Sequence, residues 1–112
     1  MPQLKIQSNT AIPDATEILE KSSSFLSKIL GKPEKYIMVS FEVNPEMIFG
    51  GTSAPLLYLE LKSIGFPTGR TKEISSKLCE FLHQETGIPI NRMYIEFSDV
   101  ERSMWGWNGS TF

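Results

Sequence analysis

One short pattern occurs twice in the sequence, and this repetition limits the folds available to the chain. The pattern is Gly-x-Pro followed by a run with strand character, at Gly31–Phe41 and again, without a gap, at Gly87–Phe97. Apolar residues with helical spacing precede the Gly in both copies: Ile18, Leu19, Phe25, Leu26, Ile29 and Leu30 in one, Ile74, Leu78, Phe81 and Leu82 in the other. This arrangement predicts a helix that ends at a left-handed Gly and is stopped by Pro. The chain is therefore predicted to use one helix–strand unit twice.

A strand is predicted ahead of each helix. Leu4–Gln7 and Leu57–Lys62 alternate between apolar and polar residues, which is the period of a half-buried strand. Asp14, three residues before Glu17, fits a capping box that begins the first helix. A helix that crosses between two strands makes them parallel, with a right-handed connection. The predicted fold class is α/β (α+β): a duplicated βαβ unit, with a four-stranded mixed sheet and two helices on one face.

Length and composition indicate one domain over residues 1–112, with pseudo-repeats at 1–49 and 56–104 joined through a loop at 44–54. The 112 residues are 40% hydrophobic and carry a net charge of -2, which suits a single core. Lys and Arg are scattered, so a nucleic-acid partner is not expected. Neither a signal peptide nor a membrane span is present, which excludes a membrane partner and predicts a cytoplasmic protein, with non-classical secretion left open.

The single cysteine and the single histidine restrict the chemistry further. Cys79 alone excludes an intrachain disulfide and fits a reducing compartment. Cys79 and His83 together do not supply the ligand set of a zinc site. Neither a metal nor a cofactor is expected.

Apolar residues in two places suggest that the chain associates with itself. The segments 36–43 and 56–61 carry apolar residues at neighbouring positions, which would point to both faces of the sheet although helices cover only one. The tail Met104–Phe112 contains two Trp and a Phe, too many aromatic side chains to bury within so short a segment. A second surface, most simply another copy of the chain, is expected to cover them.

Pro2 is the strongest candidate for a reactive group. Removal of Met1 before this small residue would leave a secondary amine at the Pro2 nitrogen. An α-amino group has a pKa of about 7.7–8.0, and burial or a nearby cation lowers it, so the amine could act as a general base near neutral pH. The alternative is an ordinary Met-Pro start without chemical significance.

With these features the chain resembles the macrophage migration inhibitory factor and D-dopachrome tautomerase family of the tautomerase superfamily. The resemblance runs over the full length and implies the duplicated βαβ fold. It also implies a homotrimer in which three sheets form a central barrel with the helices outside. The residues that carry it are Met1-Pro2, Gly31-Lys32-Pro33 with Tyr36-Ile37, Phe49-Gly50-Gly51, Ser63-Ile64-Gly65, Tyr94-Ile95 and the segment Gly106–Phe112.

The resemblance further implies a site at the subunit boundary. Pro2 would be the catalytic base, Lys32 would hold a carboxylate or stabilise an enolate, and the backbone N–H of Ile64, after Ser63, would donate beside it. Tyr36, Trp107 and Phe112 would form an aromatic wall, and Tyr94 would come from the neighbouring subunit. Without the resemblance, Lys32 would be read as a solvated cation at a helix C-terminus, and the tyrosines as ordinary strand residues.

Three positions depart from the family pattern. Leu56–Leu59 replaces the Cys-x-x-Cys of some members, which excludes that thiol chemistry. Glu96 takes the place of a substrate-binding Asn and would repel a carboxylate while it is ionised. Lys62, where a His is found in animal members, would add positive potential near the pocket.

Three functions are compatible with the sequence. The first is a cofactor-free keto–enol tautomerase (an isomerase) for small aromatic α-keto acids such as phenylpyruvate. The second is a cytokine-like secreted protein that binds a receptor and in which turnover is incidental. The third is a trimeric binding or structural protein with an inactive site. No sequence feature supports receptor binding.

Overall fold

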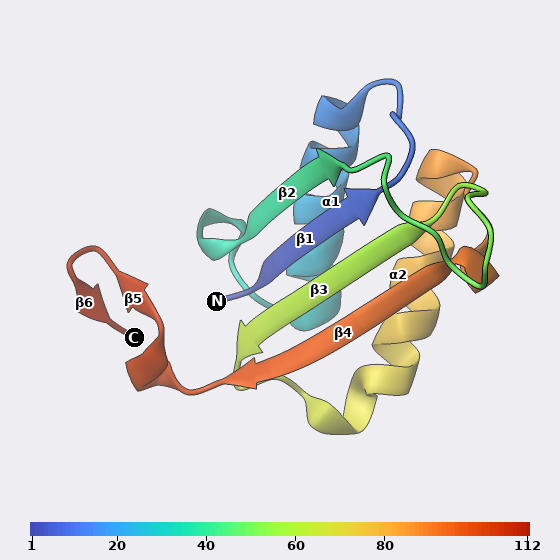
Figure 1. Cartoon of the computed structure of the whole chain (residues 1–112). Coiled ribbons are helices and arrows are strands. Elements are labelled where there is room, and N and C mark those ends of the chain that lie inside the picture. Colours follow the sequence, from blue (N-terminus) through green and yellow to red (C-terminus); the bar gives the residue numbers. More distant parts are fainter.

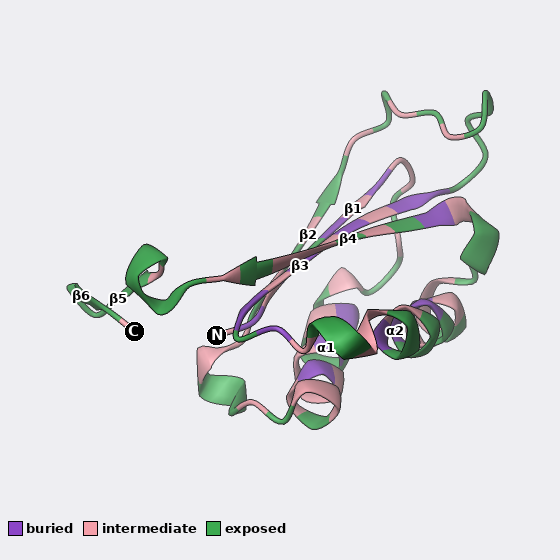
Figure 2. Cartoon of the chain, turned by 90° about the horizontal axis from the view of Figure 1, so that it is seen from below, coloured by how far each residue is buried: buried purple, intermediate pink, exposed green.

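The computed structural model describes residues 1–112 and has one four-stranded mixed sheet with both long helices on the same face (Figure 1, Figure 2). The strands are β1 (Gln3–Ser8), β2 (Met38–Val43), β3 (Leu57–Ile64) and β4 (Met93–Val100), and the helices are α1 (Ala15–Leu30) and α2 (Thr71–Thr86). The order in the sheet is β2-β1-β3-β4. β1 is parallel to β2, β3 is parallel to β4, and the central pair β1 and β3 is antiparallel. The predicted fold class is confirmed for the subunit.

The repeated Gly-x-Pro pattern has the same structure in both copies. Gly31 and Gly87 end the two helices with φ of 64° and 76°, in the left-handed region where Gly carries no steric penalty. Pro33 and Pro89 then begin one-turn 3₁₀ helices, η1 (Glu34–Tyr36) and η3 (Ile90–Arg92), which lead into β2 and β4. The helix-stop prediction is therefore confirmed, with the addition of a 3₁₀ turn before each strand. Asp14 caps α1 by accepting from the Glu17 N–H at 3.3 Å.

The core lies between the sheet and the helices. Every second residue of β3 from Leu57 to Ser63 is buried, and the residues between them are only partly buried, so one strand face packs inward and the other is open. Fully buried apolar side chains from all the core elements meet there, including Leu4, Ile6, Leu26, Leu57, Leu59, Leu61, Ile74, Leu78 and Leu82. No helix is long and apolar enough to cross a membrane.

The expectation that apolar residues point to both sheet faces holds at only a few positions, Met38, Tyr58 and Tyr94. In β2, Val39 and Phe41 pack against the core, whereas Ser40 and Glu42 alternate with them and are exposed. The open face of the other strands likewise carries mainly polar residues, Gln3, Lys5, Gln7, Glu60, Lys62 and Glu96 among them. Met38 is an exposed apolar side chain on this face, whereas Tyr58 satisfies its hydroxyl there with a hydrogen bond to Glu96. The open face therefore does not by itself require an apolar partner.

The C-terminal tail forms a small hairpin that extends beyond the end of β4 (Figure 1). A 3₁₀ turn η4 (Arg102–Met104) leads into β5 (Gly106–Trp107) and β6 (Ser110–Thr111), which pair as antiparallel strands. Asn108 and Gly109 both have positive φ, 53° and 76°, as a two-residue hairpin turn of type I′ requires. Met104 is 78% exposed and Trp107 51%. The subunit therefore does not bury its own tail.

Candidate active site

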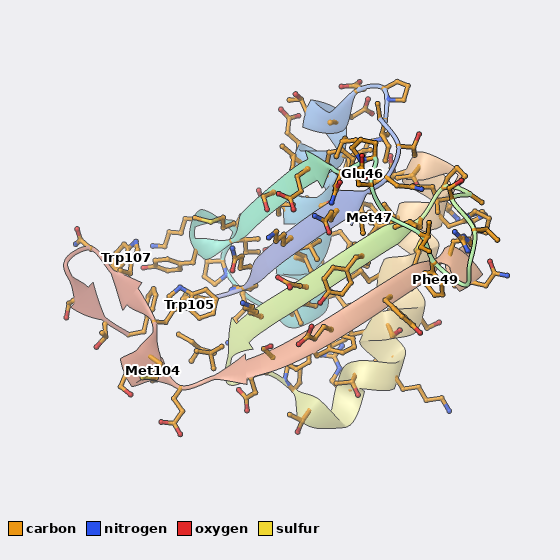
Figure 3. All side chains as sticks on the ribbon, viewed as in Figure 1. Glu46, Met47, Phe49, Met104, Trp105 and Trp107 are labelled. Atoms are coloured by element: carbon orange, nitrogen blue, oxygen red, sulfur yellow. The ribbon has the colours of Figure 1, made fainter.

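A hollow of about 340 Å³ lies where the N-terminus, η1 and the tail meet. Its lining includes Met1 and Pro2 from the start of the chain, Tyr36 from η1, and Trp107 and Phe112 from the tail. Figure 3 shows Trp105 and Trp107 beside the N-terminal end of the sheet, with Met104 below them. Residues from opposite ends of the sequence therefore form one site.

The three side chains predicted to form an aromatic wall lie in contact with one another. The Tyr36 ring meets Trp107 edge-on at 5.2 Å between centroids and Phe112 edge-on at 5.8 Å, and Trp107 stacks on Phe112 at 5.6 Å. Such contacts favour a fixed arrangement beyond the burial of apolar area. A backbone hydrogen bond from the Phe112 N–H to the Trp105 carbonyl, at 3.2 Å, closes the hairpin. The three rings therefore form one aromatic cluster at the edge of the hollow.

Pro2 lies at the beginning of the central strand and is fully buried. Its carbonyl accepts a hydrogen bond from the Met38 N–H at 3.1 Å, and from Gln3 onward the chain pairs with β2 on one side and β3 on the other. The ring therefore has a fixed position at one end of the hollow. Its nitrogen, in the described chain, is the amide that joins Met1.

Lys32 connects the turn after α1 to the end of β3. Its Nζ donates to the Ile64 carbonyl at 3.4 Å, and the Ser63 hydroxyl donates to the same oxygen, also at 3.4 Å. The Lys32 backbone is held in place by Ser27, whose hydroxyl donates to the Lys32 carbonyl at 2.6 Å. The ammonium is thus directed to the end of the sheet rather than left free in solvent. Lys32 and Ser63 both bind the carbonyl of Ile64. A role for the Ile64 N–H stays a prediction.

The electrostatic environment lowers the pKa of the terminal amine below its ordinary value of 8.0. Burial is the main cause, followed by the positive charges of Lys32 and Arg102, since both effects disfavour the ammonium form. The sequence suggested Lys62 as the second cation near this amine. The second cation that lowers the pKa of the amine is instead Arg102 on η4. The amine in the described chain belongs to Met1, one residue from Pro2.

Tyr94 and Glu96 do not join this site within the same chain. Tyr94 pairs with Tyr58 near the start of β3, whereas Ile64 pairs with Val100 at its far end; at about 3.3 Å per residue, Tyr94 and Ile64 are roughly 20 Å apart. Tyr94 lines a second, apolar hollow of about 410 Å³ with Met47, Ile48 and Phe49, and its ring lies 4.6 Å from that of Phe49, tilted by 35°. Figure 3 places Met47 and Phe49 at the end of the sheet opposite to Trp105 and Trp107.

Glu96 is held by Tyr58 on the open face of the sheet. The Tyr58 hydroxyl lies 2.5 Å from a Glu96 oxygen and 3.3 Å from a Glu60 oxygen. The pKa of Tyr58 rises to about 12, chiefly because of the hydrogen bond to Glu96 and then because of burial. Glu96 therefore presents a carboxylate that is fixed in orientation by a donor.

Sequence reasoning missed several residues around these sites, among them Lys35, Met38, Arg102 and Tyr58. Lys35 and Met38 line the first hollow, and the Lys35 ammonium lies 5.1 Å from the Tyr36 ring centroid. Lys35 could have been found from its position next to Tyr36. Arg102 and Tyr58 gave no sequence signal, because the first depends on the path of the tail and the second on strand register.

The fold and the hollow together define a class of protein: a duplicated βαβ subunit in which an N-terminal Pro lies against an aromatic wall. The profile of the macrophage migration inhibitory factor family, described as "Macrophage migration inhibitory factor (MIF)", matches residues 1–112. The chain belongs to this family, which is part of the tautomerase superfamily, and the resemblance seen in the sequence is confirmed.

Individual relatives agree with this assignment. The chain is 40% identical over 116 residues to a macrophage migration inhibitory factor homolog of Brugia malayi, with 100% of this chain and 99% of the relative covered. It is 36% identical to the macrophage migration inhibitory factor of Xenopus tropicalis, with the same coverage. Among solved structures, the homologue from Prochlorococcus marinus has a TM-score of 0.91 at 46% identity and 98% coverage of both chains. The Trichinella spiralis protein has a TM-score of 0.91 at 33% identity, covering 98% of this chain and 99% of that one.

Proposed function

We propose that this protein is a cofactor-free keto–enol tautomerase for small aromatic α-keto acids such as phenylpyruvate, with Pro2 as the general base once Met1 has been removed. The observation that carries the proposal is the position of Pro2, buried at one end of a hollow with an aromatic wall. Family membership supports the class of reaction, since the family belongs to the tautomerase superfamily. The substrate and the catalytic residue are the new parts.

In the proposed mechanism the Pro2 nitrogen takes a proton from the carbon next to the keto group and returns it to the keto oxygen. The base must be neutral when substrate binds, and burial together with Lys32 and Arg102 favours the neutral amine at this end of the sheet. Lys32 would face the substrate carboxylate or the developing enolate, and a preorganised charge there lowers the barrier. Tyr36, Trp107 and Phe112 would hold the aromatic ring.

The proposed site is completed by a neighbouring subunit in a homotrimer. The subunit has two different apolar surfaces at opposite ends, the tail with Trp107 and the second hollow with Ile48 and Tyr94. Two unlike patches on one chain favour head-to-tail contacts, which can close into a ring. Such contacts would bring Tyr94 and Glu96 of one subunit to the Pro2 hollow of the next. A fixed carboxylate at Glu96 would then disfavour an anionic group and favour a hydrogen-bond donor at the far end of the substrate.

The experiment that tests the proposal is the rate of phenylpyruvate tautomerisation before and after substitution of Pro2. Intact-mass analysis first establishes which chains have lost Met1. Pro2→Gly keeps an amine at the same place and should retain part of the rate, whereas a chain that keeps Met1 should be inactive. Full activity in a chain that keeps Met1 would exclude the Pro2 amine as the base. Absence of turnover in the processed chain would favour a binding protein instead.

A further inference from the structure

The proposed function needs the peptide bond between Met1 and Pro2 to be hydrolysed. It does not say whether this happens before or after the chain folds. In that reaction water adds across the amide. The bond between the Met1 carbonyl carbon and the Pro2 nitrogen breaks, methionine leaves with the new carboxylate, and the Pro2 nitrogen takes a proton to become a secondary amine. We propose that the folded subunit is closed to this hydrolysis, so that Met1 must be removed before β1 is enclosed in the sheet.

The backbone on the Pro2 side of the bond is fully occupied in the folded chain. Pro2 is buried, and its carbonyl is bound by the Met38 N–H at 3.1 Å. Gln3, the next residue, pairs with Met38 on β2 and with Lys62 on β3. Met1 is only partly buried, but it lies against the hollow as one of its lining residues. No free segment therefore follows the bond that has to be cut.

An aminopeptidase has to surround the scissile amide and to hold the residues after it in its own cleft. To present Pro2 and Gln3 in that way, the chain would have to pull β1 out from between two strands. Leu4 and Ile6 on β1 are fully buried in the core, so this opening would cost a large part of the global stability. Fraying of the first residue alone would not expose the bond.

Two populations of the folded protein follow from this order of events. A chain processed early folds with a basic nitrogen at Pro2. A chain that folds first keeps Met1 beside the hollow and an amide, without basicity, at Pro2. The second population would be inactive, and it would stay so for as long as the chain remains folded.

The experiment is digestion of the folded Met1-containing chain with a purified methionine aminopeptidase, followed by intact mass. The chain is obtained by expression with the cellular aminopeptidase inhibited. A matched control carries a Gly-Ser-Gly-Ser insertion between Pro2 and Gln3, which leaves the same Met-Pro bond but places it outside the sheet. A peptide of residues 1–10 shows that the enzyme cleaves this sequence. Circular dichroism confirms that both proteins are folded.

We expect the peptide and the insertion protein to lose methionine. The cleavage rate of the unmodified folded chain should be lower than theirs by a factor of about a thousand at least. Digestion in urea at a concentration that unfolds the chain and leaves the aminopeptidase active, as the peptide shows, should restore cleavage. Equal rates for the unmodified chain and the insertion protein would overturn the inference. Resistance of both proteins would also overturn it, because burial of Pro2 would not be the cause. Mass is the only readout, so the result does not depend on tautomerase activity.

Discussion

Substitution of Lys32 by Ala tests the electrostatic part of the proposed site most directly. The Lys32 ammonium is partly buried and bonded to the Ile64 carbonyl at 3.4 Å. A hydrogen bond to a charged group contributes about 1.5–3 kcal/mol, and a fully preorganised oxyanion contact about 2.7–4 kcal/mol. The lower range suits a half-buried side chain, and it corresponds to a loss of about 10- to 150-fold in kcat/KM for phenylpyruvate.

The same substitution should also change the pH profile. Lys32 lowers the pKa of the amine at this end of the sheet, so its removal should raise that pKa towards the ordinary value. The acidic limb of kcat/KM, below which the base is protonated, should therefore move to higher pH. Stopped-flow or continuous absorbance measurements of phenylpyruvate tautomerisation between pH 5 and 9 would measure both effects.

A matched control is Lys28→Ala, because Lys28 is an exposed cation in the last turn of α1. If Lys32 acts only as a cation at the helix C-terminus, the two variants should behave alike, with small changes in stability and none in kcat/KM. Lys32→Arg should keep part of the activity, since it preserves the charge but changes its shape. An unchanged kcat/KM and an unmoved acidic limb in Lys32→Ala would refute the assignment of this residue to the site.

Three further predictions concern the base, the assembly and the core. In the chain without Met1, the acidic limb of kcat/KM should have its midpoint below about pH 7.7–8.0, the pKa range of a free α-amino group. Arg102→Gln should move this midpoint to higher pH, and Lys62→Gln should leave it unchanged. The reverse pattern in a pH–rate series would show that the wrong cation was assigned. Deletion of Trp105–Phe112 should weaken the proposed trimer and lower the activity together, as light scattering and the tautomerase assay would report. A fully active monomer would contradict the proposal of a shared site. Leu59→Ala should lower the free energy of unfolding by about 2–5 kcal/mol in urea denaturation, because Leu59 is fully buried. Lys72→Ala, at an exposed position on α2 away from the tail, should change it by less than about 0.5 kcal/mol.

The sequence predicted the elements of the fold because their signals are local. The helix ends at Gly31 and Gly87 depend on backbone conformations that Gly adopts most easily, and the alternation in Leu57–Lys62 reports directly which side chains face inward. The prediction that a strand over 36–43 carries apolar residues on both faces differs from the structure for a physical reason. Tyr36 lies in a 3₁₀ turn rather than in a strand, so the strand begins two residues later, and Met38 is followed on the open face by the polar residues Ser40 and Glu42.

The site was only partly accessible to the same reasoning. The resemblance grouped Tyr36, Trp107 and Phe112, and the structure brings these rings together. The contact between the Lys32 ammonium and the Ile64 carbonyl was not predicted, because the resemblance assigned a role to the Ile64 N–H instead. Arg102 acts on the terminal amine only because η4 turns the tail back towards the N-terminus. The hydrogen bond from the Tyr58 hydroxyl to Glu96 depends on the register between β3 and β4. Contacts of this kind arise from packing between distant segments, which local patterns do not encode.

The meeting of Pro2 with Phe112 in one hollow has a consequence for synthesis of the chain. Residues near both ends of the chain must be present before the aromatic side chains can lie beside Pro2. Contacts so distant in sequence form slowly, since a long loop must close first. A ribosome-bound chain whose last residues are still in the exit tunnel would hold Pro2 without Trp107 or Phe112 around it. The hollow is therefore a late product of synthesis, and a fusion at either end of the chain would alter its lining.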